Sequence, residues 1–306
     1  MAAPAERYAP FRKRLDDFIE AARRIHEGDV EAVHRTRVAS RRLREFVPLL
    51  GLDHDTSEKL SQQLTKVTRR LGKVRELDVL SLEVDQLSCD GAYSAPALRE
   101  LSADVAHERA SARQHLATKL SPKKLDEIVE KLQRVAEHLK SDEPKRYSRT
   151  PIRGPRQAWL LALDARIARR ATRVRSAIES AGATYSPARL HDVRIAVKKL
   201  RYASELLAEA RRQRATPAIQ TLKSAQDLLG RLHDRQVLIE RARRLQASSL
   251  DLTAGDRLGA LAHALEVDCR TLHARYMDDR ALLMATAARM GGAAPGDAIE
   301  GSRIAS

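Results

Sequence analysis

The chain has 306 residues, of which 43% are apolar but only 3% aromatic, and its formal net charge is +15. The scarcity of aromatic side chains and the abundance of Ala, Leu, Arg and Glu favour helices over strands, so we expect an all-α protein. Such an excess of positive charge indicates a polyanionic partner, such as nucleic acid, an anionic membrane or another phosphate polymer.

Helical patterns are predicted on both sides of a segment that is rich in turn-forming residues. Residues 141–156 hold three prolines and one glycine among mixed charges, which indicates a linker. The tail at residues 291–306 is predicted to be disordered. The predicted helices span residues 8–27, 31–50, 56–87, 95–119 and 122–139 before the linker, and 156–180, 187–210, 216–246 and 254–285 after it.

The sequence contains two pairs of similar segments. VHRTRVASRRLR at residues 33–44 is similar to LHDVRIAVKKLR at residues 190–201. LGKVRELDVL at residues 71–80 is similar to LGRLHDRQVL at residues 229–238. Because both pairs occur in the same order and at nearly the same offset, we predict an internal duplication.

The first repeated segment is predicted to form a helix with a cationic face and an apolar face. At roughly 100° per residue, His34, Arg37, Arg41 and Arg44 fall within roughly 80° of arc and span about 15 Å. The opposite, apolar side holds Ala39, Leu43, Phe46 and Leu50. In the second copy the cationic side holds His191, Arg194, Lys198 and Arg201, and the apolar side Ala196, Leu200, Ala203 and Leu207. Arg42 and Lys199 lie at the flanks of the cationic faces.

These cationic faces suit a phosphate ligand. Like charges three or four residues apart repel one another, and an anion bound along them would convert that repulsion into binding. The guanidinium fork of arginine can bond two phosphate oxygens at once, and a histidine held neutral by neighbouring arginines can still donate one hydrogen bond. A solvated face is the ordinary explanation of a single charge run, but recurrence in both copies favours a binding site.

The four segments resemble the motifs of the CHAD domain (conserved histidine α-helical domain). H-x-x-R-x-x-x-R-R-L-R matches residues 34–44, and L-G-x-x-R-[DE]-x-D-V matches residues 71–79. H-x-x-R-x-x-x-K-[KR]-L-R-Y matches residues 191–202, and L-G-x-x-x-D matches residues 229–234. The resemblance covers about residues 8–290.

The resemblance implies two pseudo-symmetric antiparallel helical bundles, packed around a basic central cavity that binds inorganic polyphosphate, in some members at polyphosphate granules. It implies one domain over residues 8–290, with halves at 8–140 and 157–290. The implied binding residues are His34, Arg37, Arg41, Arg42, Arg44, His191, Arg194, Lys198, Lys199 and Arg201, with Arg109, Arg113 and Lys223 as an extension.

The chain departs from the family pattern at a few positions. Glu76 stands where aspartate is commoner, which keeps the charge pattern. In the second half, His233 and Asp234 replace the usual asparagine and acid, and Gln236 replaces a later acid. The alternating-glutamate motif of CYTH-type triphosphate-processing domains is absent, so we expect the helical domain alone.

Binding without catalysis is the expected activity. The sequence has neither a P-loop nor an H-E-x-x-H motif, and we expect Asp78 and Asp234 to orient basic side chains or satisfy backbone groups. The arginines around His34 and His191 would repel a cation, so we expect no metal and no other cofactor. Cys89 and Cys269 have no metal-ligand spacing and read as free thiols.

Nucleic acid is the alternative partner. The cationic faces lack aromatic side chains for base stacking and Asn or Gln for reading base edges, but backbone binding of DNA or RNA stays open. An adaptor role, with partner proteins on another face, is a third possibility. No signal peptide and no apolar run of membrane-spanning length is present, so we expect a cytoplasmic protein with no membrane contact.

Overall fold

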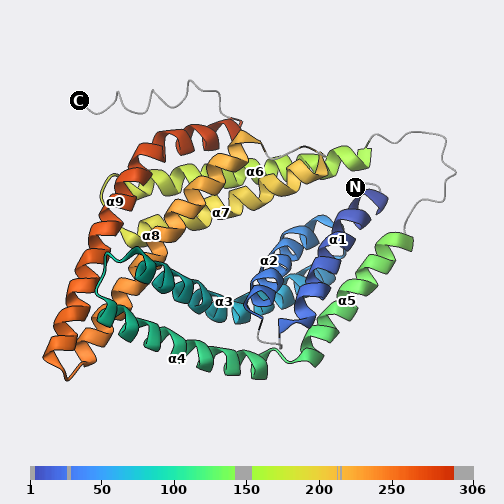
Figure 1. Cartoon of the computed structure of the whole chain (residues 1–306). Coiled ribbons are helices and arrows are strands. Elements are labelled where there is room, and N and C mark those ends of the chain that lie inside the picture. Colours follow the sequence, from blue (N-terminus) through green and yellow to red (C-terminus); the bar gives the residue numbers. More distant parts are fainter. Residues whose placement is uncertain (1–3, 26–28, 142–153, 212, 214–215, 293–306) are drawn as a thin grey trace, which may run out of the picture. The chain divides into compact units, whose positions relative to one another are not determined.

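The computed structural model describes residues 4–25, 29–141, 154–211, 213 and 216–292. All regular elements in these ranges are helical, which confirms the expected all-α class (Figure 1). The α-helices are α1 (Pro4–Arg23), α2 (Val30–Phe46), α3 (His54–Asp90), α4 (Ala95–Lys119), α5 (Pro122–Ser141), α6 (Gly154–Ala181), α7 (Pro187–Ala210), α8 (Pro217–Ser248) and α9 (Leu252–Met290). A short 3-10 helix, η2 (Val47–Leu49), follows α2.

Most helix bounds agree to within about three residues with those expected from the sequence. The predicted bounds of α1 and α9 are wrong: α1 spans Pro4–Arg23 in place of 8–27, and α9 continues to Met290 beyond the predicted end at 285. Helices α4 and α7 begin and end at the predicted residues. The predicted helix over residues 31–50 is wrong at its end, because α2 stops at Phe46. Pro48 has no N–H with which to continue an α-helix, and the chain tightens so that the Leu50 N–H donates to the Val47 carbonyl at 3.1 Å. Most of the predicted linker and of the predicted tail lies outside the described residues.

The chain forms two compact units, which divide at residues within α3, α4 and α6. Unit 1 holds residues 1–86 and 102–160, and unit 2 holds residues 87–101 and 161–306. The expected duplication, the central cavity and the boundaries of the two halves stay predictions.

In unit 1, α1 packs against both α2 and α5. Three aromatic rings anchor this packing. The ring centroids of Phe11 and Phe46 are 6.3 Å apart, and those of Phe46 and Trp159 are 6.1 Å apart. Helix α3 contributes the fully buried side chains Leu64 and Leu71. The buried face of α2 is therefore fixed from several sides, which orients its opposite face.

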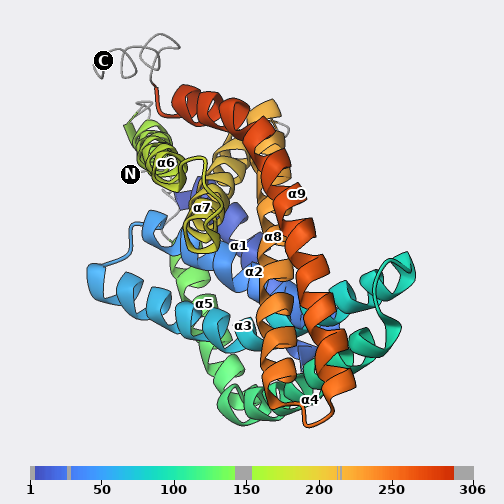
Figure 2. The ribbon, with the colours of Figure 1, turned by 90° about the vertical axis from the view of Figure 1, so that its left-hand side faces the viewer.

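In unit 2, α8 packs along α9 and against α7, and Figure 2 shows α8 and α9 running side by side. Val193 and Leu200 of α7 lie in the same core as Leu229 of α8 and Tyr276 of α9. The segment at residues 87–101 joins this unit through a hydrogen bond from the Tyr93 hydroxyl to the Asp268 carboxylate.

None of the helices in the described ranges combines the length and the apolar character that crossing a bilayer requires.

Candidate anion-binding site

Helices α2 and α7 carry the two predicted cationic faces. Asp29 caps the N-terminus of α2, where its carboxylate accepts hydrogen bonds from the backbone N–H groups of Glu31 and Ala32 at 2.8 and 3.2 Å. Pro187 begins α7, where its fixed backbone angle suits the first helical turn. The apolar side chains predicted on α2 are buried, and those predicted on α7 are buried or packed against the core. The cationic residues therefore lie on the outer faces of α2 and α7.

We call the predicted residues of α2 the first stripe (His34, Arg37, Arg41, Arg42 and Arg44) and those of α7 the second stripe (His191, Arg194, Lys198, Lys199 and Arg201). Corresponding members have the same degree of exposure. Arg42 and Lys199 are exposed, and all the others are half-buried. Half-buried arginine and lysine side chains lay their aliphatic stems on the protein and hold their charged ends near solvent. Each stripe is thus a partly ordered cationic surface, and its role in binding stays a prediction.

Each stripe also has a neighbour, on the helix that carries the other repeated segment, that sequence reasoning did not assign to the site. In unit 1, Arg75 of α3 acts electrostatically on His34. In unit 2, the ring of His233 of α8 lies 4.8 Å, between centroids, from the ring of His191. Arg75 and His233 occupy the same position in the repeated segments at residues 71–80 and 229–238. That shared position was the signal in the sequence that could have identified both residues.

Burial and neighbouring positive charge favour the neutral forms of His34 and His233. Burial, followed by the charge of Arg75, lowers the pKa of His34. Burial lowers the pKa of His233 to about 4, and Arg194, His191 and Lys198 contribute by repelling a further positive charge. A neutral imidazole can donate one hydrogen bond to a phosphate oxygen and can take up a proton once an anion is bound.

Arg194 and Arg201 of the second stripe differ in the hydrogen bonds and ion pairs that their guanidinium groups form. The Nε atom of Arg194 is buried and has no hydrogen-bond partner among the described residues. Arg201 donates to Gln226 at 3.0 Å, forms an ion pair with Glu205 and covers the ring of Tyr202 at 4.7 Å. Since the guanidinium of Arg201 is already bonded to Gln226 and Glu205, whereas the Nε of Arg194 has no partner in the described part of the chain, Arg194 is the more available of the two for an anion.

The predicted extension residues fall into two groups. Arg109 and Arg113 of α4 donate to the Asp78 carboxylate of α3 at 2.6 and 3.3 Å. This arrangement confirms the expected role of Asp78 in orienting basic side chains, whereas that of Asp234 stays a prediction. Lys223 is an exposed residue of α8, and its exposure to solvent is the one structural property that supports a part in binding.

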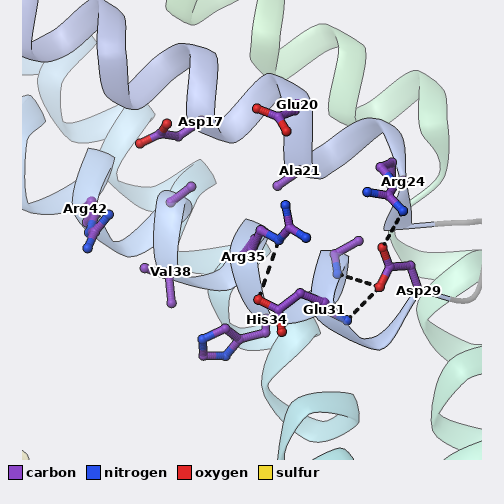
Figure 3. Close-up of a pocket in the computed structure, with 12 residues that line it drawn as sticks. Asp17, Glu20, Ala21, Arg24, Asp29, Glu31, His34, Arg35, Val38 and Arg42 are labelled. Atoms are coloured by element: carbon purple, nitrogen blue, oxygen red, sulfur yellow. Dashed lines mark hydrogen bonds and ion pairs between the residues drawn. The ribbon is translucent and has the colours of Figure 1, made fainter.

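A hollow of about 360 Å³ lies between α1 and α2, beside the first stripe (Figure 3). His34 and Arg42 line it together with several acids. Figure 3 shows two internal ion pairs, Arg24 with Asp29 at 3.0 Å and Arg35 with Glu31 at 3.5 Å. Because its charges are mixed, this hollow does not suit a polyanion and marks an edge of the first stripe.

Comparisons with known proteins agree with this architecture. A family model described as the CHAD domain matches residues 9–243. PptA from Streptomyces chartreusis is similar in structure, with a TM-score of 0.60 and 18% identity, over 91% of this chain and 99% of that chain. The CHAD domain from the plant Ricinus communis is similar with a TM-score of 0.55 and 20% identity, over 94% of this chain and 92% of that chain. At these identities the two structures show the fold alone. No curated protein matches the chain.

Proposed function

The chain belongs to the CHAD domain family, and from that premise we propose that it binds inorganic polyphosphate without converting it chemically. The family as a whole is associated with polyphosphate binding. The observation that carries the proposal for this chain is the match between its two stripes. They repeat one histidine and four cationic residues at the same spacing and with the same exposure on α2 and α7.

Binding would be multivalent and electrostatic. Arginine forks contact pairs of phosphate oxygens, and the histidines of the stripes donate hydrogen bonds. Each stripe is about 15 Å long, so several consecutive phosphates can contact it. Counterions released from the polymer supply a large part of the binding free energy.

The proposed role is that of a binding protein. The stripes provide charge neutralisation and hydrogen-bond donors, which suffice to hold a polyphosphate. Phosphoryl transfer would need, in addition, a positioned base or nucleophile and usually metal ions held by carboxylates. In the cell we propose a cytoplasmic location, with recruitment to polyphosphate granules as the result of binding.

A competition titration near physiological salt tests the ligand class. Fluorescent long-chain polyphosphate is bound to the protein and displaced by unlabelled polyphosphate, single-stranded RNA or duplex DNA at equal phosphate concentration. We expect polyphosphate to displace the probe at concentrations about tenfold lower than either nucleic acid, a difference of about 1.4 kcal/mol. Equal displacement by all three would make the stripes a generic polyanion surface and nucleic acid the leading partner.

The affinity for polyphosphate should depend steeply on salt. Each phosphate neutralised on a single strand releases about 0.7 counterions, so about six contacts predict a slope near −4 in a plot of log affinity against log salt. Titrations at several NaCl concentrations measure this slope. A flat profile would contradict an electrostatic site.

Affinity should also rise as the pH falls from about 7.5 to about 5.5. His34 and His233 have lowered pKa values in the free protein, and a bound polyanion favours their protonated forms, so their pKa values rise in the complex. Protons are therefore taken up on binding, which strengthens binding at lower pH by at most about tenfold for each unit of pKa increase, a limit that is reached only below the pKa of the free protein.

The control for this pH effect is His34→Gln/His233→Gln, in which neither position titrates. We expect its affinity to change less with pH than that of the parent chain, and identical profiles would exclude these two histidines as the cause.

The stability of the free protein also depends on pH in this range. Because the pKa of folded His233 lies below the unfolded value of about 6.5, the free energy of unfolding declines as pH falls from about 6.5 towards 4. Circular dichroism therefore has to accompany the titration.

A further inference from the structure

Unit 1 contains a second basic surface, which lies between α3 and α5. Two hollows, of about 640 and 180 Å³, share the lining residues Gln63 and Lys131. They therefore form one continuous depression between residues 59–70 of α3 and 124–138 of α5, which we call the α3–α5 groove. At 1.5 Å per residue, the α3 side of the groove is about 17 Å long.

The α3–α5 groove uses a different face of α3 from the one that packs towards the first stripe. The groove-lining residues of α3 recur at spacings of three and four, so they share one side of the helix. Thr68 and Arg75 lie on the opposite side. The Thr68 hydroxyl is 2.9 Å from the Ser40 hydroxyl of α2, and Arg75 acts on His34. An anion on the first stripe would leave the groove accessible.

Positive charge lines both sides of the groove. The basic residues are Lys59, Lys66 and Arg70 from α3, and Lys124, Lys131, Arg134 and His138 from α5. Arg134 lies 3.8 Å from Glu130, whereas the four lysines and Arg70 form no ion pair with any described residue. Of the acids that line the groove, Asp53 already caps α3 by accepting from the Thr56 N–H at 2.9 Å. Lys59 acts on Asp53, and Glu127 is the other lining acid, so six lysines and arginines face two acids and the groove carries an excess of positive charge.

The groove differs from the stripes in having apolar residues along its base. Leu52 is half-buried, whereas Leu60 and Val67 on one side, and Ile128 and Val135 on the other, reach the groove only with the edges of otherwise buried side chains. A ligand with an apolar face and acidic edges would complement both the base and the rims. Inorganic polyphosphate has no apolar surface and would bury none of the apolar edges that the groove still exposes.

We propose that the α3–α5 groove docks an acidic amphipathic helix of a partner protein. Such a helix places apolar side chains at positions i, i+3, i+4 and i+7 into the groove and presents Asp and Glu to the lysines on either rim. About 12 helical residues cover the length of the groove. A chain that holds a phosphate polymer through its stripes and a protein through this groove would link the two, although the docking site itself does not depend on the stripes.

A peptide of about 18 residues, with Leu at the apolar positions and Glu on the flanks, is a suitable probe. Its binding to the full chain is measured by fluorescence anisotropy near physiological salt, beside a peptide of the same composition in scrambled order. We expect the amphipathic peptide to bind about tenfold more tightly than the scrambled one, since only the former buries apolar surface.

Charge reversal locates the binding. Lys66→Glu/Lys131→Glu, one change on each rim, should weaken binding of the amphipathic peptide by about tenfold or more. The matched control Lys119→Glu/Lys123→Glu reverses two exposed charges of unit 1 that do not line the groove, and it should leave most of the affinity intact. A variant that lacks the basic residues of both stripes should lose only the modest long-range attraction that its lower net charge removes and should still prefer the amphipathic to the scrambled peptide about tenfold, which separates this proposal from the proposed function.

Three results would overturn the proposal. They are equal affinity for the two peptides, unchanged affinity of Lys66→Glu/Lys131→Glu, and displacement of the peptide by polyphosphate from the variant without stripes, which would make the groove a second polyanion site. If Lys66→Glu/Lys131→Glu does not fold, amide hydrogen exchange of the unaltered chain, with and without the peptide, locates the binding site. Protection by the peptide is expected at residues 59–70 and 124–138, and protection confined to other segments would contradict the proposal.

Discussion

Replacing Arg37, Arg41, Arg194 and Lys198 by alanine should lower the affinity for polyphosphate by about 100-fold or more and leave the helical content unchanged. Even about 0.7 kcal/mol from each of four charged contacts amounts to about 2.8 kcal/mol, which is a factor of about 100. All four side chains are half-buried on the outer faces of α2 and α7, away from the apolar core, so their loss should not unfold either unit. Fluorescence anisotropy measures the affinity, and circular dichroism the helical content.

A matched variant separates the stripes from net charge. Arg99, Lys123, Arg169 and Arg173 are exposed and lie outside both stripes, so changing them to alanine removes the same four charges. We expect this control to lose only about threefold in affinity, the effect of reduced long-range attraction. Similar losses in both variants would mean that affinity reports total charge, and an unchanged affinity in the stripe variant would refute the site assignment.

Two double variants, each altered in one unit, test whether both units bind polyphosphate. Arg37→Ala/Arg41→Ala alters unit 1 alone, and Arg194→Ala/Lys198→Ala alters unit 2 alone. If one polymer contacts both stripes, each double variant should lose about tenfold, and the two losses should combine in the quadruple variant. If one double variant binds as the parent chain does, only the other stripe is a polyphosphate site.

Asp78→Asn should lower the free energy of unfolding by about 3 kcal/mol. The Asp78 side chain is fully buried and accepts from Arg109 and Arg113, so removing its charge leaves two guanidinium groups without their counterion. Breaking a buried ion pair costs about 3–5 kcal/mol, and we expect the lower end because the arginine side chains are 30% and 25% exposed. Thermal or urea unfolding followed by circular dichroism measures the loss.

Asp85→Asn is the control for this prediction. Asp85 is an exposed acid of the same helix, and replacing it should change stability by less than about 0.5 kcal/mol. Equal stability of Asp78→Asn and Asp85→Asn would show that the buried carboxylate does not hold α4 to α3. A selective loss would also connect stability with the basic surface, since Arg109 and Arg113 are the predicted extension of the binding site.

Local patterns in the sequence were enough to predict the all-α class, most helix bounds and the faces of α2 and α7. Apolar residues at spacings of three and four specify which side of a helix is buried, and the residues between them must then face outward. The bounds of α4 and α7 could be predicted because proline and glycine mark the breaks. The exception after Phe46 arose because Pro48 changes the type of helix without ending the helical path.

Only the tertiary structure brought together residues that are distant in the chain. It brought the charge of Arg75 close enough to act on His34, placed His233 against His191, and paired Asp78 with arginines of α4. It also assembled the α3–α5 groove from two helices whose sequences, taken singly, show only ordinary charged faces. The physical reason is that periodicity specifies one helix at a time, whereas contacts between helices depend on crossing angle and on side-chain interdigitation across the whole core.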